Sequence, residues 1–531
     1  MTVEIGDKST MPERELSELV ELLRALIRIR SVNPPGHEIL VARYLEQILA
    51  EEGIPATIVE PYPGRGSVVA RLRGDGTRGD GAGGDGAGHT RAGGDGSRDE
   101  GSRGERDGSS GDALLLLSHL DVVPAEPAGW RHDPFGGDLA DGYVWGRGAL
   151  DMKSMVAMEV QVMRRLARSA RAAGRDPATD PIPGLRRDVI FCSTADEEAG
   201  GSKGANWIVE NHPDWLRAAG ALNEAGAMAT PYGGITFYPI QVAEKGLAVY
   251  KVRVKGRWGH GSVPTSDNAA LLAARVVVRV SKPGPVRLTE PIRVSLMRAI
   301  PHLTARAAAT ITAFAPAVEM GGTKNGTLRP AAGAATDPAV DPAVDPAVDP
   351  AGIEAALLEL RDPVLARTLS AMVRNTISVG VIRAGLKYNV IPGVAEVELD
   401  CRMLPGTDEP AMRDELRHRI GDELWDRIEV ELVVTGPPVQ APLDNPLYRL
   451  LEKVVAAHDP DGLPLPFLAP FATDAKHLAR IGVPTYGFSP LKTGSGDGLL
   501  ALMHGDDERV SVEALGWGFP VLYDAVTSFC R

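Results

Sequence analysis

Apolar residues recur along the chain at two spacings, one typical of amphipathic helices and the other of buried strands. Residues 13–30 and 38–52 show the helical spacing. Residues 113–117 form an uninterrupted apolar run, as expected of a strand buried on both faces, and residues 188–194 form a similar one. Between them, residues 153–165 predict an amphipathic crossover helix. Strands and helices that alternate in this way predict an α/β fold.

The pattern changes near Gly246, where a second unit begins. We predict strands at 247–254, 377–382 and 395–401 and a helix at 268–280. The order of strand and helix resumes after about Pro437. The simplest architecture is therefore a large α/β domain, formed by residues 1–245 and 437–531, which is interrupted by a smaller α+β domain at 246–436.

Two segments of biased composition separate these elements. Residues 74–112 are mostly Gly, Asp, Arg, Ser and Ala, which bury too little apolar surface to order a chain, so this insert is predicted to be disordered. Because strand-like runs flank it, we interpret it as an overgrown hairpin turn. A repeat of Asp-Pro-Ala-Val starts at Asp337, and its prolines exclude a helix, which predicts an extended linker at about 330–352.

Length and charge narrow the class of protein. A chain of 531 residues exceeds one compact core, and its apolar fraction of 44% is that of a globular protein. The net charge of −13, without a long basic block, argues against nucleic acid as a partner. The N-terminus lacks a secretory pattern, and no apolar run approaches the roughly 20 residues of a membrane helix. We expect a cytoplasmic protein with no membrane partner.

Histidine and carboxylate residues follow the predicted strands. His119 and Asp121, in the segment SHLDVVP, come directly after a buried strand, at the edge of a parallel sheet where ligands bind. A His-x-Asp pair can place the imidazole on a metal while the carboxylate holds the other ring nitrogen. The alternative is a strand-end histidine bonded to the backbone. Asp151 ends a glycine turn, GRGALD, at the start of a helix, where an aspartate can instead cap the helix.

Three further segments carry similar side chains. TADEEAGG places three consecutive carboxylates, residues 196–198, after a strand, where they repel one another unless cations hold them. Glu224 in NEAG and His504 in MHGDDERV complete the set. The three cysteines are scattered, so the ligands are histidines and carboxylates, which suit zinc, cobalt or manganese. Five such ligands exceed one catalytic zinc and fit two ions that share a bridging carboxylate.

In their order along the chain, these segments closely resemble the motifs of the M20 metallopeptidase family. The matching segments are SHLDVVP, DPFGG, GRGALDMK, TADEEAGG, NEAG, GHGSVP, YNVIP and MHGDDERV. The resemblance runs from about residue 13 to the C-terminus, apart from the two low-complexity segments. That family includes carboxypeptidase S-like enzymes, aminoacylases, succinyl-diaminopimelate desuccinylases and acetylornithine deacetylases. The resemblance implies a zinc-peptidase-like catalytic domain with an inserted lid of the dimerisation type.

The resemblance also implies a role for each candidate residue. The metal ligands would be His119 and Glu224 on one ion, Glu198 and His504 on the other, and Asp151 between the two. A cis peptide bond would join Asp151 to Met152. Glu197 would be the general base, which takes a proton from water and passes it to the leaving amine. Asp121 would hold the second ring nitrogen of His119.

Three residues of the lid match family positions that act on substrate. His260, in GHGS, resembles the histidine that stabilises the tetrahedral oxyanion, often from the partner subunit. Asn389 and Arg402 match positions that bind the substrate's carboxylate, which an arginine can pair bidentately. The alternative for Arg402 is a surface ion pair. The lid also carries a long extra stretch at about 281–369, and such extensions replace the partner in some relatives, so a homodimer stays open.

The function that these residues favour is hydrolysis by two divalent ions, zinc in the first place. The substrate would be a small dipeptide or an N-acyl amino acid, whose amide bond is cleaved to release a free amino acid. A biosynthetic deacylase for N-acetylornithine or N-succinyl-diaminopimelate is the alternative, because these substrates also carry carboxylates. A catalytically silent binding protein is disfavoured, because the base and all five ligands are present.

Overall fold

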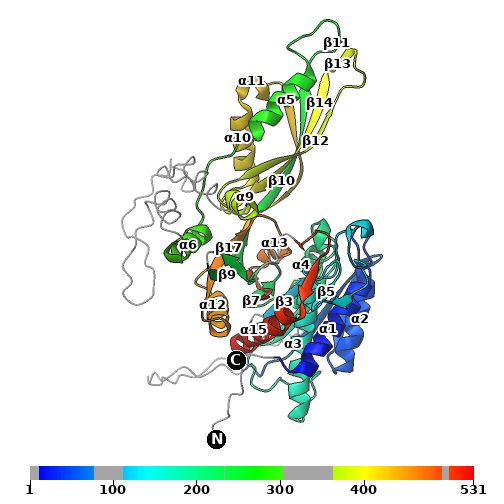
Figure 1. Cartoon of the computed structure of the whole chain (residues 1–531), viewed down its shortest axis with the longest axis vertical. Helices are drawn as coiled ribbons and strands as arrows, with labels where there is room; N and C mark the ends of the chain where they lie inside the picture. The colour runs from blue at the N-terminus through cyan, green and yellow to red at the C-terminus, as the bar shows by residue number, and fades with distance from the viewer. Residues whose placement is uncertain (1–10, 77–111, 233, 303–362, 493–501) are drawn as a thin grey trace, which may run out of the picture.

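The computed structural model describes residues 11–76, 112–232, 234–302, 363–492 and 502–531. The described residues form two bodies, a larger one that contains both the first and the last helix and a smaller one inserted between them (Figure 1). This arrangement confirms the predicted α/β architecture with an inserted α+β unit. None of the helices described is both long and apolar enough to cross a membrane.

A mixed sheet of ten strands forms the centre of the larger body. In spatial order its main path is β1 (Ala56–Tyr62), β2 (Arg65–Leu72), β6 (Val189–Thr194), β3 (Leu114–His119), β7 (Gly220–Asn223), β18 (Thr485–Gly487), β9 (Ile235–Glu244) and β16 (Val439–Gln440). Two further strands, β8 (Thr230–Tyr232) and β17 (Gly462–Ala469), pair with β9. Strands β6, β3, β7 and β18 run parallel, so their carboxyl ends meet at one edge.

Helices cover both faces of this sheet, which explains the uninterrupted apolar run in β3. Leu114 and Leu116 belong to the core on the side of the long helices, whereas Leu115 and Leu117 belong to a separate core on the other side. The first side carries α1 (Glu13–Arg28), α2 (Glu38–Glu51), α3 (Lys153–Ala172), α12 (Pro446–His458) and α15 (Val512–Cys530). The second carries α4 (Ala205–Asn211) and α13 (Ala475–Ala479). A strand between two helical layers needs apolar side chains at every position.

The interpretation of the insert at 74–112 as a hairpin turn is wrong. Strand β6 lies between β2 and β3, antiparallel to the first and parallel to the second. Strands β2 and β3 are therefore antiparallel without being neighbours, and the apolar pattern of β6 is what allows it to be buried between them. The sequence shows the direction of neither strand, so it does not distinguish a hairpin from this order. The predicted disorder of 74–112 and the linker at 330–352 fall mainly or wholly outside the described residues.

The smaller body is a four-stranded antiparallel sheet with helices on one face. Its order is β12 (Thr376–Ala384), β14 (Val394–Met403), β10 (Gly246–Lys255) and β15 (Ile428–Gly436), covered by α5 (Ala269–Val280), α10 (Glu409–Ile420) and the short α11 (Asp422–Trp425). Alternate residues of β10 and β14 are buried under the helices. The other face carries ion pairs across the strands, such as Lys251–Glu396 at 3.5 Å and Arg383–Glu398 at 2.7 Å. Charges on this face are therefore partly paired across the strands.

Part of the extra stretch at 281–369 packs on the larger body. Helix α6 (Glu290–Ala299) lies along β17 of the large sheet (Figure 1). The hydroxyl of Ser295 donates to the carbonyl of Pro466, and Arg298 pairs with Glu452. Ile292 belongs to the core of the larger body. The described part of this stretch therefore packs against the large domain and is held there by side-chain contacts. Residues 303–362 lie outside the described residues.

Candidate metal centre

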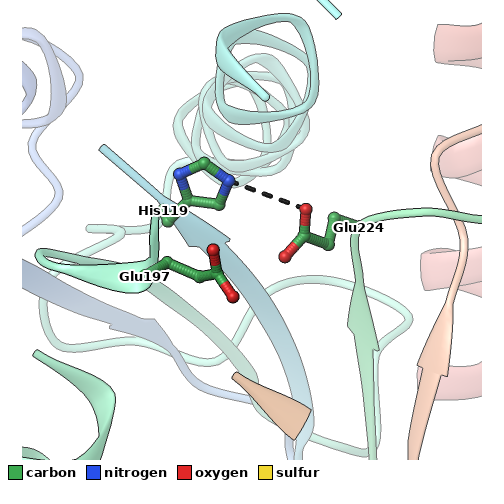
Figure 2. Close-up of side chains that lie close together, drawn as sticks. All are labelled: His119, Glu197 and Glu224. Atoms are coloured by element: carbon green, nitrogen blue, oxygen red, sulfur yellow. Dashed lines mark ion pairs between the residues drawn. The ribbon is translucent and has the colours of Figure 1, made fainter. Parts of the chain in front are cut away.

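His119 is the last residue of β3, and its ring faces a group of carboxylates. Its Nε2 lies 3.1 Å from Oδ1 of Asp151. The same nitrogen lies 3.6 Å from Oε2 of Glu224 (Figure 2). Its Nδ1 lies 3.1 Å from the carbonyl of Asp121. Burial lowers the pKa of His119, but the charge of Glu224 and the hydrogen bonds outweigh burial and raise it well above its usual value. The backbone contact that we considered as an alternative is present, yet Nε2 points at the carboxylates.

Asp151 lies between the two histidines. Its Oδ1 contacts His119, and its Oδ2 lies 3.2 Å from Nε2 of His504. The side chain does not cap α3, whose N-cap is Met152, so capping is not its role. The peptide bond between Asp151 and Met152 is cis, as predicted. One carboxylate that reaches two histidines with separate oxygens has the geometry of a bridging ligand.

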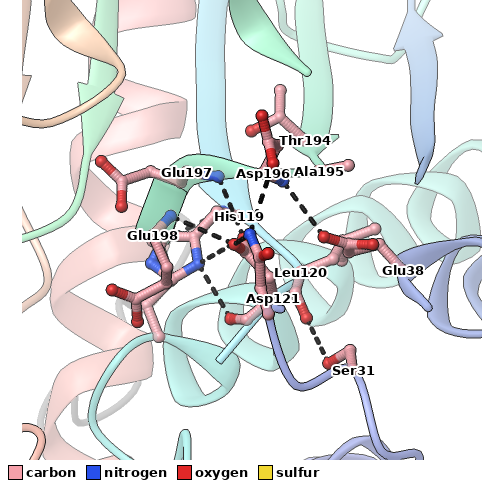
Figure 3. Close-up of polar contacts among 12 residues, drawn as sticks. Ser31, Glu38, His119, Leu120, Asp121, Thr194, Ala195, Asp196, Glu197 and Glu198 are labelled. Atoms are coloured by element: carbon pink, nitrogen blue, oxygen red, sulfur yellow. Dashed lines mark hydrogen bonds and ion pairs between the residues drawn. The ribbon is translucent and has the colours of Figure 1, made fainter. Parts of the chain in front are cut away.

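The turn after β6 carries Glu197 and Glu198, and Asp121 holds its backbone. Oδ1 of Asp121 accepts a hydrogen bond from the N–H of Glu197, and Oδ2 accepts one from the N–H of Glu198, both at 3.1 Å (Figure 3). Asp196, just before them, has a left-handed φ of 70°. Burial opposes the ionisation of Asp121, but hydrogen bonds from His119 and Asn33 hold its pKa below the usual range. Asp121 thus organises both His119 and the turn.

The carboxylates of this centre fall into two groups that share His119. One joins His119, Glu197 and Glu224, and the other joins His119, Asp151 and Glu198, with ligand atoms within 4.8 Å of one another in each. Glu198 Oε1 lies 3.3 Å from Nε2 of His504. This oxygen of Glu198 is buried and receives no hydrogen bond. These donors suit hard or borderline divalent ions, and every group in the described part of the chain that could hold a metal belongs to this centre.

The carboxyl groups of the candidate metal centre lie close together, and few positively charged side chains lie near them. Burial, and then the neighbouring charge of Glu224, raises the pKa of Glu197 well above its usual value. Burial also raises the pKa of Glu224 to about 7, although His119 opposes the shift. Carboxylates that are buried close together ionise readily only when positive charge is supplied. The residues present therefore fit bound divalent cations.

Sequence reasoning missed Glu508, which shapes the turn that carries Asp151. Its carboxylate is fully buried and accepts hydrogen bonds from three backbone N–H groups, those of Gly148 at 3.0 Å, Leu150 at 2.7 Å and Asp151 at 3.1 Å. Arg147 pairs with it at 2.6 Å. Glu508 lies in the quoted segment MHGDDERV, but a run of three acidic residues does not show which one points inward.

Lys476 was also missed, because no local pattern marks it. It lies in α13, and its Nζ donates to the carbonyl of Thr473 at 2.8 Å. Burial lowers the pKa of Lys476, but Asp474, Glu197 and Glu244 together raise it. A cation therefore stands near the predicted base, on a segment that follows it by almost three hundred residues.

A comparison with family models gives one match that spans most of the chain. The model described as Peptidase family M20/M25/M40 matches residues 115–528. The chain belongs to this family. As an M20 protein it is an enzyme of the peptidase and amidohydrolase type.

Known proteins similar to this M20 enzyme include two curated relatives. N-fatty-acyl-amino acid synthase/hydrolase PM20D1 of Xenopus tropicalis is 27% identical over 415 residues, which cover 76% of this chain and 69% of that protein. Aminoacylase-1 of Sus scrofa is 25% identical over 505 residues, which cover 92% and 90%. The M20 family metallo-carboxypeptidase Sso-CP2 from Sulfolobus solfataricus shares the fold, with a TM-score of 0.59, 15% identity and coverage of 98% of this chain and 99% of that one.

In this M20 enzyme, two of the lid residues lie together but away from the metal centre. Strand β11 (Gly259–His260) pairs with β13 (Val390–Ile391), which places His260 next to Asn389. Figure 1 shows this pair of strands at the end of the lid that is farthest from β3 and β7. His260 is exposed, and its Nδ1 lies 2.7 Å from the hydroxyl of Ser262. The single chain thus does not bring them to its own centre.

Arg402 lies at the other end of the lid, near the end of β14 and opposite Leu247 at the start of β10. Its guanidinium donates to both oxygens of Asp400, at 2.7 and 3.1 Å, so the ion pair that we considered as the alternative is present. Burial and then the charge of Arg402 lower the pKa of Lys245, the last residue before β10, to about 7. Arg402 therefore belongs to a positive region where the lid joins the large sheet.

Proposed function

We propose that this protein is a two-metal hydrolase that cleaves the amide bond of N-acyl amino acids or small dipeptides and releases a free amino acid. The observation that carries the proposal is Asp151, whose two oxygens contact His119 and His504 separately. Each histidine has a further carboxylate beside it, Glu224 at 3.6 Å and Glu198 at 3.3 Å. Each half of the centre thus supplies one histidine, one glutamate and a share of Asp151.

The proposed ligands are those of the sequence prediction, and zinc is the proposed metal, with cobalt or manganese as the alternatives. When bound, two such ions would polarise the scissile carbonyl and lower the pKa of a water between them. Asp121 keeps His119 in one orientation through the contact with its Nδ1. Glu508 fixes the backbone of Asp151 by accepting a hydrogen bond from its N–H group.

Glu197 is the proposed general base. Its backbone is fixed by Asp121, and it lies beside the ligand Glu198. Its carboxylate would take a proton from the attacking water and donate it to the amine that leaves. Glu197 also lies close enough to His119 and Glu224 to be a metal ligand. Substitution of Glu197 distinguishes the two roles, because loss of a base lowers the rate with the metals still bound, whereas loss of a ligand releases an ion.

The names of the relatives favour an N-acyl amino acid over the biosynthetic alternatives. An enzyme named for N-fatty-acyl amino acids and an aminoacylase both match most of this chain. Arg402 suits the substrate's carboxylate, which would replace Asp400 as its partner. Asn389 lies at the far tip of the lid, so it would join only from a second chain. An acetylornithine or succinyl-diaminopimelate deacylase is the second candidate function. A substrate panel that includes both compounds distinguishes it from the first.

The test is hydrolysis of a panel of N-acyl amino acids, dipeptides, N-acetylornithine and N-succinyl-diaminopimelate by the purified full chain. We expect turnover of N-acyl amino acids or dipeptides. Removal of metal with a chelator should lower the rate at least about 100-fold, and added zinc or cobalt should restore it, because the ions supply the activated water. Turnover that is indifferent to chelation would contradict the two-metal mechanism. Turnover confined to either biosynthetic substrate would favour the second candidate.

We propose that the protein acts as a homodimer through its lid. Strand β12 is at the edge of the lid sheet, with no partner among the described residues on its outer side. Leu271 and Val278, one helical face of the neighbouring α5, are 51% and 64% exposed. A second chain that pairs here would explain why His260 lies away from its own centre, since it would reach the partner's.

Mixing two inactive variants tests this dimer. His260→Ala removes the lid histidine, and Glu197→Gln removes the base, so each dimer should lose activity. If His260 acts on the partner's centre, a fully exchanged equal mixture should recover about a quarter of the parental rate, because half of the dimers are mixed and each has one complete site. No recovery, with exchange verified by mass, would contradict action between subunits.

A further inference from the structure

A single arginine lies among three buried carboxylates beneath the metal centre. Arg65, in β2, has only 5% of its surface exposed, and Glu38, Asp121 and Asp196 are buried as well. The guanidinium Nη1 lies 2.5 Å from Oε1 of Glu38 and 3.4 Å from Oδ1 of Asp196. Figure 3 shows the three carboxylates around the turn that leads to Glu198. Buried charges of one sign need a partner, and Arg65 is the cation that contacts two of these three.

Arg65 reaches the third carboxylate through Asn33. Its Nη2 donates to Oδ1 of Asn33 at 2.7 Å, and the amide of Asn33 donates in turn to Oδ2 of Asp121 at 2.8 Å. The contact with Arg65 fixes which side of the Asn33 amide faces Asp121, because a guanidinium can only donate. The hydrogen bond from Asn33 to Asp121 is therefore coupled to the contact between Asn33 and Arg65.

The same arginine reaches the turn by a second path. Oε1 of Glu38, held by Arg65, accepts the backbone N–H of Asp196 at 3.2 Å. Asp196 has a left-handed φ of 70°, a conformation that is costly for a residue with a Cβ and needs support from its surroundings. Two chains of hydrogen bonds thus lead from Arg65 to the turn of Glu197 and Glu198, one at its first residue and one through Asp121.

The chain also makes room for this guanidinium. A Cβ added at Gly36, where φ is +86°, would come within 2.1 Å of Nη1 of Arg65. Only glycine at that position lets the backbone pass so close to the arginine. The planar fork matches two acceptors at once, which the single ammonium of a lysine does not.

We propose that Arg65 is a positioning residue for the turn of Glu197 and Glu198. It touches neither substrate nor metal, and it acts by orienting Asn33 and Glu38, which in turn hold Asp121 and Asp196. This inference rests on the proposed function, because it gives the turn its purpose. Outer partners of this kind change metal affinity or activity by about 10–100-fold when they are replaced.

The test compares Arg65→Met and Arg65→Lys with Arg168→Met in the full chain. Arg168 is the control because it also holds two carboxylates, Glu52 at 2.6 Å and Glu18 at 2.7 Å, on a helix remote from the turn. We expect Arg65→Met to lower kcat about 10–100-fold, with KM changed by less than about threefold, and Arg65→Lys to fall between it and the parent. Arg168→Met should keep the parental kcat at a comparable loss of melting temperature.

A readout that does not need turnover separates this proposal from the proposed function. In the cobalt-loaded proteins, the visible spectrum reports the ligand geometry around the ion that Glu198 is proposed to bind. We expect a changed spectrum in Arg65→Met and an unchanged one in Arg168→Met. If the parent hydrolyses none of the panel, the proposed function fails while this comparison still decides the role of Arg65.

A folded second variant keeps the test decisive. Asn33→Asp leaves an acceptor for Arg65 but removes the donor to Asp121, so it should reproduce the fall in kcat and the changed spectrum even where Arg65→Met is poorly folded. A parental kcat and spectrum in both Arg65→Met and Asn33→Asp would overturn the proposal. An equal loss of kcat in Arg65→Met and Arg168→Met would also overturn the proposal, because it would mark the role of Arg65 as purely structural.

Discussion

Glu197→Gln in the zinc-loaded protein is expected to lower kcat by about 10²–10⁴-fold while both metals remain bound. The amide keeps the shape of the side chain but cannot accept the proton of the attacking water. The backbone of residue 197 donates to Asp121, so the substitution leaves the turn in place. KM should change little, because the proton moves only in the chemical step. Single-turnover rates and metal content per chain check both halves of this prediction.

Glu159→Gln is the matched control. Glu159 is a buried carboxyl on α3 whose Oε2 lies 2.6 Å from the hydroxyl of Ser118, behind the strand that carries His119. Burial raises the pKa of Glu159 well above its usual value, which favours the neutral carboxyl group, and an amide resembles that form closely. We expect its kcat to stay within about threefold of the parent. A parental kcat in Glu197→Gln would show that Glu197 is not the general base. Loss of a metal ion from this variant would identify Glu197 as a ligand.

The part of the site that could be predicted is the part that follows strands. His119 ends β3, the turn of Glu197 follows β6, and Glu224 follows β7. A buried strand has a strong local signature, and parallel strands end at a common edge, so local patterns alone bring these residues together. Asp151 and His504 were candidates from their local segments, and the family motifs gave them their roles, which no spacing argument supplies. In the structure the two side chains lie 3.2 Å apart.

The rest depended on contacts between distant segments. The position of β6 between β2 and β3 is set by pairing with β3 over 75 residues and with β2 over more than a hundred, which apolar periodicity does not encode. Arg147 and Glu508 are 361 residues apart, and nothing near either one signals the other. Arg65 reads as an ordinary charged residue next to a strand. Its function in the network appears only when Asn33 and Glu38 are packed against it.

Asp151→Asn is the second substitution with a large expected effect. Both oxygens of Asp151 contact histidines, so the charge of this one carboxylate is shared between the two halves of the centre. An asparagine offers one oxygen and one amide nitrogen, and the nitrogen is a donor that a cation repels. We expect kcat/KM to fall by about 10³-fold or more, equivalent to roughly 4 kcal/mol of transition-state stabilisation. Metal content after dialysis should fall together with it.

Asp188→Asn makes the same chemical change at the opposite end of the sheet, where Asp188 precedes β6 and accepts from Arg71 and Gly74. It should keep two ions per chain and the parental kcat, at a modest cost in stability. The pattern of metal loss in Asp151→Asn then decides how the centre is built. Loss of affinity for both ions supports a shared bridge, because each half loses a ligand. Loss of one ion alone assigns Asp151 to a single half and contradicts the bridge, whereas two tightly bound ions would remove it from the ligand set.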